Sequence, residues 1–387
     1  MFCAFSRLRK EILKIIARIL DVMTNTAGGD ADLLTPVLHD VRRVRRWRLA
    51  DWDLAIRQAR QAGLLSRLAA DIGNAGLMTA VAERARPALE AALILAEKHA
   101  EDVARELRYI GAALAGTGSP VILLKGASYA AAGLPPARGR LFGDIDVLVA
   151  RNALPAAEAA LLAQGWESAK DDEYDQSYYR RWMHEIPPLQ HKARRTTIDL
   201  HHTITPPTSA HPVDARRMIE AATPVGDGFF RVLAPVDMVL HSAVHLFDDG
   251  EFANALRDLD DLNRLLRHFG AMAGFWDALA RRAASLGLER PLYYALRYAA
   301  KRLGTPVPAP LLVSPLLRPP APVIRRFMDL IFAHALAPPH ASCRRRGSGA
   351  ALGFLYLRAH HLRMPLRLLL PHLLRKAVMR RLKPATV

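Results

Sequence analysis

The chain has 387 residues, of which 51% are hydrophobic and 24% charged, an ordinary balance for a globular protein with a packed core. Its two cysteines lack metal-ligand spacing, which excludes a disulfide scaffold and a zinc–cysteine cluster and favours a reducing, cytoplasmic environment. No apolar run reaches the ~20 residues of a membrane-spanning helix, and the net charge of +17 raises the hypothesis of a polyanionic partner.

Residues 1–34 are expected to form an amphipathic N-terminal extension that ends in a linker. Apolar residues recur there at helical spacing, among them Leu8, Ile12 and Ile19, with Lys and Arg on the opposite face. These cations interrupt any signal-peptide core, so the segment either packs on the protein or lies on a membrane surface. Helical spacing then continues over 35–116 and predicts an N-terminal helical region.

The pattern changes over 117–232, where short apolar runs predict an α/β core. The continuous run over 121–126 is typical of a buried strand, and the run over 144–150 predicts a second strand. The stretch 187–204 predicts a hairpin, of which the second strand carries Asp199. The middle of the chain is therefore predicted to form a small α/β unit.

Two aspartates stand two positions apart in the second of these predicted strands. Because side chains alternate along a strand, Asp144 and Asp146 are expected to share one face, while Ile145 and Val147 point into the core. Two carboxylates side by side on a buried sheet are costly unless a cation neutralises them. The pair therefore predicts a bound metal ion.

The order of these motifs resembles a family of bacterial uncharacterised nucleotidyltransferases, within the superfamily that shares the polymerase β fold. The resemblance rests on "LLKG" ending at Gly126, an arginine before "GDIDVLV", and "IDLHH" after it. It implies an α+β fold, in which a small mixed-sheet nucleotidyltransferase core is flanked by N-terminal and C-terminal helical regions. It also implies an enzyme that transfers NMP from an NTP to an acceptor, which is a small molecule, a sugar phosphate or a protein.

The same resemblance gives three acids catalytic and metal-binding roles. Asp144 and Asp146 would hold Mg²⁺ or Mn²⁺, and Asp199 would complete the site on the nucleophile side and help take the proton. Two divalent ions ~3.5–4 Å apart can stabilise both the attacking and the leaving oxygens of such a transfer. Carboxylate oxygens are the ligands that Mg²⁺ prefers.

Four residues near the first strand are expected to bind the nucleotide phosphates. Gly126 would let backbone amides approach the triphosphate closely. The superfamily usually has Gly-Ser at this turn, whereas this chain has Gly126-Ala127, with Ser128 one place further on and Lys125 before it. Lys125 or Arg140 is therefore expected to supply the positive charge, and the alternative role of Arg140 is to pin the loop.

Three histidines are candidates for orienting the metal ligands. His201 shares the strand face of Asp199, and its alternative role is that of a hydrogen-bonded core residue. Asp237, His241 and His245 follow one another at successive turns of a predicted helix, which forms either a wall of the nucleotide pocket or a structural polar seam. No H-E-x-x-H motif accompanies them, which excludes a metalloprotease of that type.

The C-terminal part of the chain divides into three predicted regions. A helical region over 233–304 is followed by a connector over 305–322, which holds seven prolines, and by basic helices over 323–387. From Arg318 onward, fourteen Lys and Arg residues face one acid, Asp329, so most of the net charge of +17 lies in this tail. The tail makes a peripheral position at the inner membrane face a hypothesis.

Two other functions compete with nucleotidyl transfer. The first is a catalytically inactive scaffold whose basic C-terminal helices bind nucleic acid or anionic membrane, and the intact set Asp144, Asp146 and Asp199 argues against it. The second is a glycosyltransferase that binds a nucleotide sugar through its DxD motif. Helical rather than alternating α/β segments precede the motif, which argues against that function.

Overall fold

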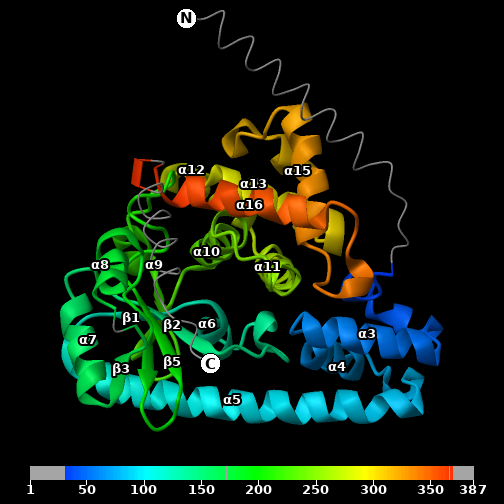
Figure 1. The fold of residues 1–387 in the computed structure, drawn as a ribbon, viewed down its shortest axis with the longest axis horizontal. Helices are drawn as coiled ribbons and strands as arrows, with labels where there is room; N and C mark the ends of the chain where they lie inside the picture. Colours follow the sequence, from blue (N-terminus) through cyan, green and yellow to red (C-terminus); the bar gives the residue numbers. More distant parts are fainter. Residues whose placement is uncertain (1–30, 171, 366, 369–387) are drawn as a thin grey trace, which may run out of the picture.

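The computed structural model describes residues 31–170, 172–365 and 367–368. The predicted N-terminal amphipathic helix and the end of the basic tail lie outside the described residues. The fold is α+β, as the sequence predicts, with a seven-stranded mixed sheet surrounded by helices (Figure 1). Within the described ranges, none of the helices has the length and hydropathy that crossing a bilayer requires.

The sheet has the strand order β3-β4-β5-β2-β1-β7-β6. Its strands are β1 (Val121–Leu123), β2 (Asp144–Leu148), β3 (Trp166–Ser168), β4 (Leu189–His191), β5 (Thr197–His201), β6 (Thr223–Pro224) and β7 (Phe230–Val232). The pairs β2–β5 and β1–β7 are parallel, and the other neighbours are antiparallel. The antiparallel pairing of β4 with β5 confirms the predicted hairpin.

Four helices connect the strands of this sheet. They are α6 (Lys125–Ala131), α7 (Leu154–Ala163), α8 (Glu173–Trp182) and α9 (Arg216–Ala221). The helix α7 has Pro155 in its first turn, where the missing N–H has no helical partner to lose. The first strand was predicted over 121–126 but ends at Leu123. It is shorter because α6 begins at Lys125, where a φ of 42° turns the backbone into the helix.

The N-terminal helices form a layer with its own hydrophobic cluster, which includes the fully buried Trp52. They are α2 (Leu34–His39), the 3₁₀ helix η1 (Val41–Arg46), α3 (Leu49–Gln61), α4 (Leu65–Asn74) and α5 (Arg86–Leu114). The 29-residue helix α5 runs along one side of the molecule, beneath both α3 and α4 and the sheet (Figure 1). It therefore joins the N-terminal helices to the strands.

The C-terminal helices share one continuous hydrophobic cluster with the sheet. They are α10 (Pro235–Asp248), α11 (Ala255–Phe269), α12 (Phe275–Leu286), α13 (Glu289–Leu303), α14 (Ala309–Val313), α15 (Pro322–Ala335) and α16 (Ser348–Arg363). The short helix α14 lies inside the predicted proline-rich connector. The last of these helices, α16, ends two residues before Pro365, as expected because proline disfavours helical backbone in the residue before it.

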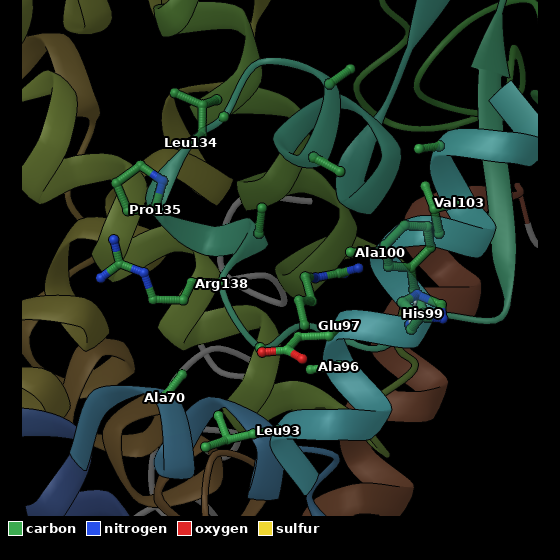
Figure 2. Close-up of a pocket in the computed structure, with 18 of the residues that line it drawn as sticks. Ala70, Leu93, Ala96, Glu97, His99, Ala100, Val103, Leu134, Pro135 and Arg138 are labelled. Carbon is green, nitrogen blue, oxygen red and sulfur yellow. Dashed lines mark hydrogen bonds between the residues drawn. The ribbon is translucent and has the colours of Figure 1, made fainter. Parts of the chain in front are cut away.

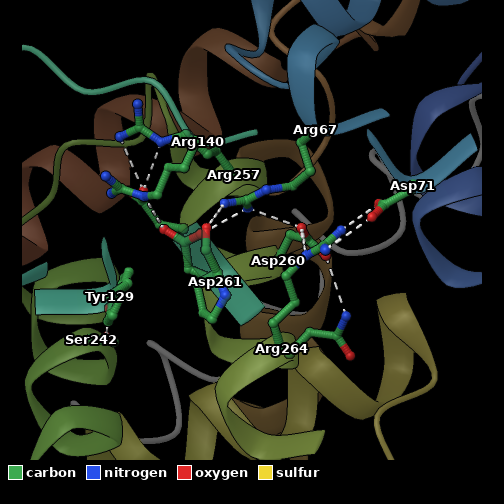
Figure 3. A network of polar contacts seen from close by, with 12 residues as sticks. Arg67, Asp71, Tyr129, Arg140, Ser242, Arg257, Asp260, Asp261 and Arg264 are labelled. Atoms are coloured by element: carbon green, nitrogen blue, oxygen red, sulfur yellow. Dashed lines mark hydrogen bonds and ion pairs between the residues drawn. The ribbon is translucent and has the colours of Figure 1, made fainter. Parts of the chain in front are cut away.

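A buried ionic network ties α4, α11 and the loop before β2 together (Figure 3). Arg140 donates through Nε to Asp261 at 2.7 Å, and Arg67 contacts the same carboxylate at 2.7 Å and Asp260 at 3.0 Å. Burial alone would raise the pKa of Asp261, but Arg140 and Arg67 outweigh it and hold that pKa below its ordinary value. The network fixes the loop that leads into β2.

We expect Asp261→Asn to lower the free energy of unfolding by about 3–5 kcal/mol, because it leaves two buried guanidinium groups without their shared carboxylate. Asp53→Asn is the matched control, since the Asp53–Arg57 pair is exposed and its loss is expected to cost less than about 1 kcal/mol. Urea unfolding at neutral pH measures both. Equal effects of the two substitutions would show that the network does not stabilise the fold.

Candidate active site

The strands β2 and β5 bring the predicted acids together in one cavity. They pair in parallel with Asp146 opposite Asp199 and Asp144 opposite Thr197, so all of these side chains share one face of the sheet. A cavity of about 780 Å³ opens over this face, and Asp144, Asp146, Asp199 and Lys125 all line it. The structure therefore places next to one another two strands that are separated in sequence by the helices α7 and α8 and the strands β3 and β4.

The carboxylate of Asp146 is buried between two donors. Lys125 Nζ lies 2.7 Å from Asp146 Oδ1, and His201 Nε2 lies 3.0 Å from the same oxygen. Burial alone would raise the pKa of Asp146, but Lys125 and His201 outweigh it and leave that pKa well below its ordinary value. The ion pair also outweighs the effect of burial on Lys125, whose pKa is raised.

This arrangement corrects the charge argument drawn from the sequence. The expectation was two buried carboxylates that require a metal ion for neutralisation. In the structure Asp144 is exposed at the start of β2, and Asp146 is neutralised by a lysine and a histidine of the chain itself. The cost of burying the pair therefore does not by itself demand a metal.

Asp199 differs from Asp146 in forming no ion pair with any of the described residues. Its Oδ1 atom is buried without a hydrogen-bond partner among the described residues. Burial, followed by the charges of Glu185 and Asp146, raises the pKa of Asp199 to about 8. Of the three predicted acids, Asp146 is therefore ionised, Asp199 is kept largely protonated near neutral pH by burial, and Asp144 is exposed.

The second residue of α6, Gly126, has no room for a side chain, because two side chains of the loop before β2 lie against it. A Cβ at this position would collide with the guanidinium of Arg140 and would lie 2.8 Å from the Phe142 ring. The predicted use of the glycine was a close approach of backbone to phosphate. In the structure the space beside it is filled by two side chains, so the glycine lets the loop before β2 pack against α6.

Two of the predicted phosphate contacts are already engaged within the protein. Ser128 is fully buried, donates its hydroxyl to the backbone carbonyl of Lys125 at 2.7 Å and does not line the cavity. Arg140 reaches the cavity wall, but its guanidinium pairs with Asp261 and lies over the rings of Tyr129 and Phe142. The structure therefore gives Arg140 the loop-pinning role, and Lys125 is the predicted cation that lies among the acids.

The three predicted histidines occupy different positions. His201 contacts Asp146 directly, as described above. His245 lines the cavity and contacts Asp249 Oδ2 through Nδ1 at 2.9 Å. His241 is buried behind the cavity wall, where burial and the nearby charge of Lys125 hold its pKa well below its ordinary value, so it is neutral.

Several cavity residues were missed by the sequence analysis. Glu185 forms an isolated antiparallel bridge with His201, and its Oε2 lies 3.5 Å from His201 Nε2. Tyr178 and Tyr179 reach the cavity from α8, which was not predicted. Glu185 stands beside His184 just before the predicted hairpin, and this pair of polar residues was the signal available in the sequence.

The helix α16 brings part of the basic C-terminal region to the cavity. His360 and Arg363 line the wall, and Arg363 Nη2 lies 3.4 Å from Asp249 Oδ1. The Nε atom of Arg363 is buried without a hydrogen-bond partner among the described residues. At least one cation of the tail therefore faces the acids rather than the outer surface.

A second cavity of about 760 Å³ lies between α4, α5 and the segment after α6 (Figure 2). Its lining is mostly apolar and includes Leu93 and Leu134, with Glu97 and Arg138 as charged members. Arg140 and Phe142 line both cavities. The loop before β2, which packs against Gly126, therefore forms the wall between the acidic and the apolar cavity.

A sequence model of a family described as "Uncharacterised nucleotidyltransferase" matches residues 48–304. No match to the chain was found among curated proteins or among solved structures. The matched range includes the sheet, Lys125 and the acids on β2 and β5, and it agrees with the resemblance drawn from the sequence. The helix α16, with His360 and Arg363, lies beyond this range.

We expect Gly126→Ala to lower the free energy of unfolding by about 1–3 kcal/mol, because the added methyl group overlaps Arg140 and the Phe142 ring. The control is Gly116→Ala, where nothing lies within 4 Å of the added Cβ. Thermal or urea unfolding measures the difference. A Gly126→Ala protein as stable as the control would contradict the packing described for this loop.

Proposed function

Since the chain belongs to the family of uncharacterised nucleotidyltransferases and is a nucleotidyltransferase enzyme, we propose that it transfers NMP from an NTP in the acidic cavity. The observation that carries this proposal is the in-register pairing of Asp146 with Asp199, which lines the cavity with acids from two parallel strands. Asp144 adds a third carboxylate from the same strand as Asp146.

We propose that the three carboxylates hold Mg²⁺ or Mn²⁺, and the donor set fits such an ion. All three offer hard oxygen donors, and Asp199 Oδ1 is a buried oxygen without a partner. Bound divalent ions would supply charge neutralisation for the reacting phosphate and the leaving pyrophosphate. A set of three carboxylates favours two bound ions rather than one.

The remaining cavity residues supply binding and orientation. Lys125 places an ammonium group among the acids, and Arg363 has an unused Nε donor, so we assign both to the triphosphate. His201 orients Asp146 through its hydrogen bond. We assign Asp199 to taking the proton of the acceptor in its ionised form, because it lines the cavity beside Asp146 and a bound divalent ion would lower its raised pKa.

The family match favours nucleotidyl transfer over the scaffold and glycosyltransferase alternatives. Contact of the basic C-terminal helices with nucleic acid or anionic membrane stays a prediction. In the part of the tail that the structure describes, two arginines of α16 instead face the protein interior. Arg363 lines the cavity, and Arg358 contacts the backbone carbonyl of Phe247 and Asp248 on α10.

We expect Asp146→Asn and Asp199→Asn each to reduce NMP transfer by at least about 100-fold, because each removes a carboxylate that we propose as a ligand of the divalent ion at the reacting phosphate. The measurement is pyrophosphate release from each of the four NTPs with Mg²⁺, using cell extract as the source of acceptor. Asp277→Asn, an exposed change on α12, is the control and should retain activity. Equal pyrophosphate release by wild type and both cavity variants would contradict the proposal.

We expect Arg363→Ala to raise the KM for the NTP about 10-fold, because a charged hydrogen bond to phosphate is lost. The matched control is Arg326→Ala, which removes an exposed arginine of α15 that does not line the cavity. Steady-state kinetics at saturating acceptor separate KM from kcat. An unchanged KM would remove Arg363 from the nucleotide site and leave it as a partner of Asp249 alone.

A further inference from the structure

A cluster of two histidines and a glutamate lies at one side of the acidic cavity. His184 and Glu185 precede β4, and His201 is the last residue of β5. One ligand atom from each of the three residues lies within 4.8 Å of the others. Glu185 Oε2 lies 3.5 Å from His201 Nε2 and 3.8 Å from His184 Nε2, so the carboxylate faces both rings.

The nitrogen donors of this cluster are not saturated by the rest of the protein. The Nδ1 atoms of His184 and His201 are both buried without a hydrogen-bond partner among the described residues. The two rings stack with centroids 5.2 Å apart, and the side chain of His201 is only 2% exposed. The Nε2 atoms of both rings, on the other side of each ring from Nδ1, are the ones that face Glu185, so the site is defined by these two nitrogens and the carboxylate.

The charge of the cavity favours a cation at this position. The described lining includes the acids Asp144, Asp146, Glu185, Asp199, Asp249 and Glu251. Of the lining arginines, Arg140 pairs with Asp261 and Arg257 with Asp258, and neither acid belongs to the cavity lining. Even with Asp199 protonated, the negative charge of the remaining acids therefore exceeds the positive charge that Lys125 and Arg363 can supply.

We propose that His184, Glu185 and His201 bind a divalent transition-metal ion of the Zn²⁺ type, at a site separate from the three aspartates. Imidazole nitrogens combined with one carboxylate suit Zn²⁺ and similar ions, whereas Mg²⁺ selects oxygen donors. The two sites are thus distinguished by ligand chemistry, although they share a cavity. The proposal does not require nucleotidyl transfer, because it rests on the geometry of the cluster alone.

The ion would lie beside Asp146, since His201 Nε2 is also 3.0 Å from Asp146 Oδ1. Coordination through this nitrogen replaces the hydrogen bond from His201 to Asp146 and leaves Lys125 as the partner of that carboxylate. The competing role for His201 is to orient Asp146 without any metal. If His201 is a metal ligand, substitution of His184 or Glu185 lowers the affinity for the metal. If His201 only orients Asp146, these substitutions leave metal affinity unchanged.

The test is a titration of the untagged full-length protein with Zn²⁺ and Co²⁺, in an excess of Mg²⁺ that fills sites made of oxygen ligands. Calorimetry gives the affinity, and the visible absorption of bound Co²⁺ reports its ligand geometry. The variants are His184→Ala and Glu185→Gln, both less buried than His201 and therefore safer for folding. The controls are His268→Ala, an exposed histidine on α11, and Asp144→Asn.

We expect one ion to bind per chain, at least about 10-fold more weakly in either cluster variant and with unchanged affinity in both controls. Absence of Zn²⁺ and Co²⁺ binding by the wild type would overturn the proposal. Unchanged affinity in the cluster variants, or equal loss in Asp144→Asn, would overturn it too, because the ion would then lie elsewhere. Pyrophosphate release with Mg²⁺, measured on the same variants, tests the proposed function separately.

Discussion

The site is organised around one buried carboxylate, that of Asp146, which lies between the ammonium of Lys125 and the imidazole of His201. An ionised carboxylate is stable in the interior only when such partners satisfy it. This requirement brings the end of β1, the strand β2 and the end of β5 to within hydrogen-bond distance. Because β2 and β5 pair in register, the same constraint sets Asp199 beside Asp146 at the cavity.

The helical body holds this arrangement from outside the sheet. Arg140 is anchored by Asp261 on α11, Asp261 is shared with Arg67 on α4, and the anchored loop packs against Gly126 at the start of α6. The loop that leads into the DxD strand is thus fixed by Asp261, which stands 121 positions further along the sequence than Arg140. The helix α16 closes the cavity from beyond the family-matched range, which makes Arg363 a feature of this chain's own C-terminal region.

The strands and their acids could be predicted from the sequence because they depend on local patterns. Alternation along β2 gives the shared face of Asp144 and Asp146, and the apolar runs around Asp199 identify β5. The partners of these groups depend on contacts between distant segments, which no local pattern shows. Three examples are the ion pair of Lys125 with Asp146, the burial of Ser128 on α6 and the approach of Glu185 to His201. The role predicted for Gly126, close approach of the backbone to phosphate, likewise fails to foresee that Arg140 and Phe142 fill the space beside it.

The most direct measurement of the central claim is a crystal structure of the protein with a non-hydrolysable NTP analogue and Ca²⁺. The account predicts a triphosphate in the acidic cavity beside Lys125, with Ca²⁺ contacting the carboxylates of Asp144, Asp146 and Asp199. An NTP analogue bound only in the apolar cavity between α4 and α5, or Ca²⁺ bound away from these three acids, would contradict it.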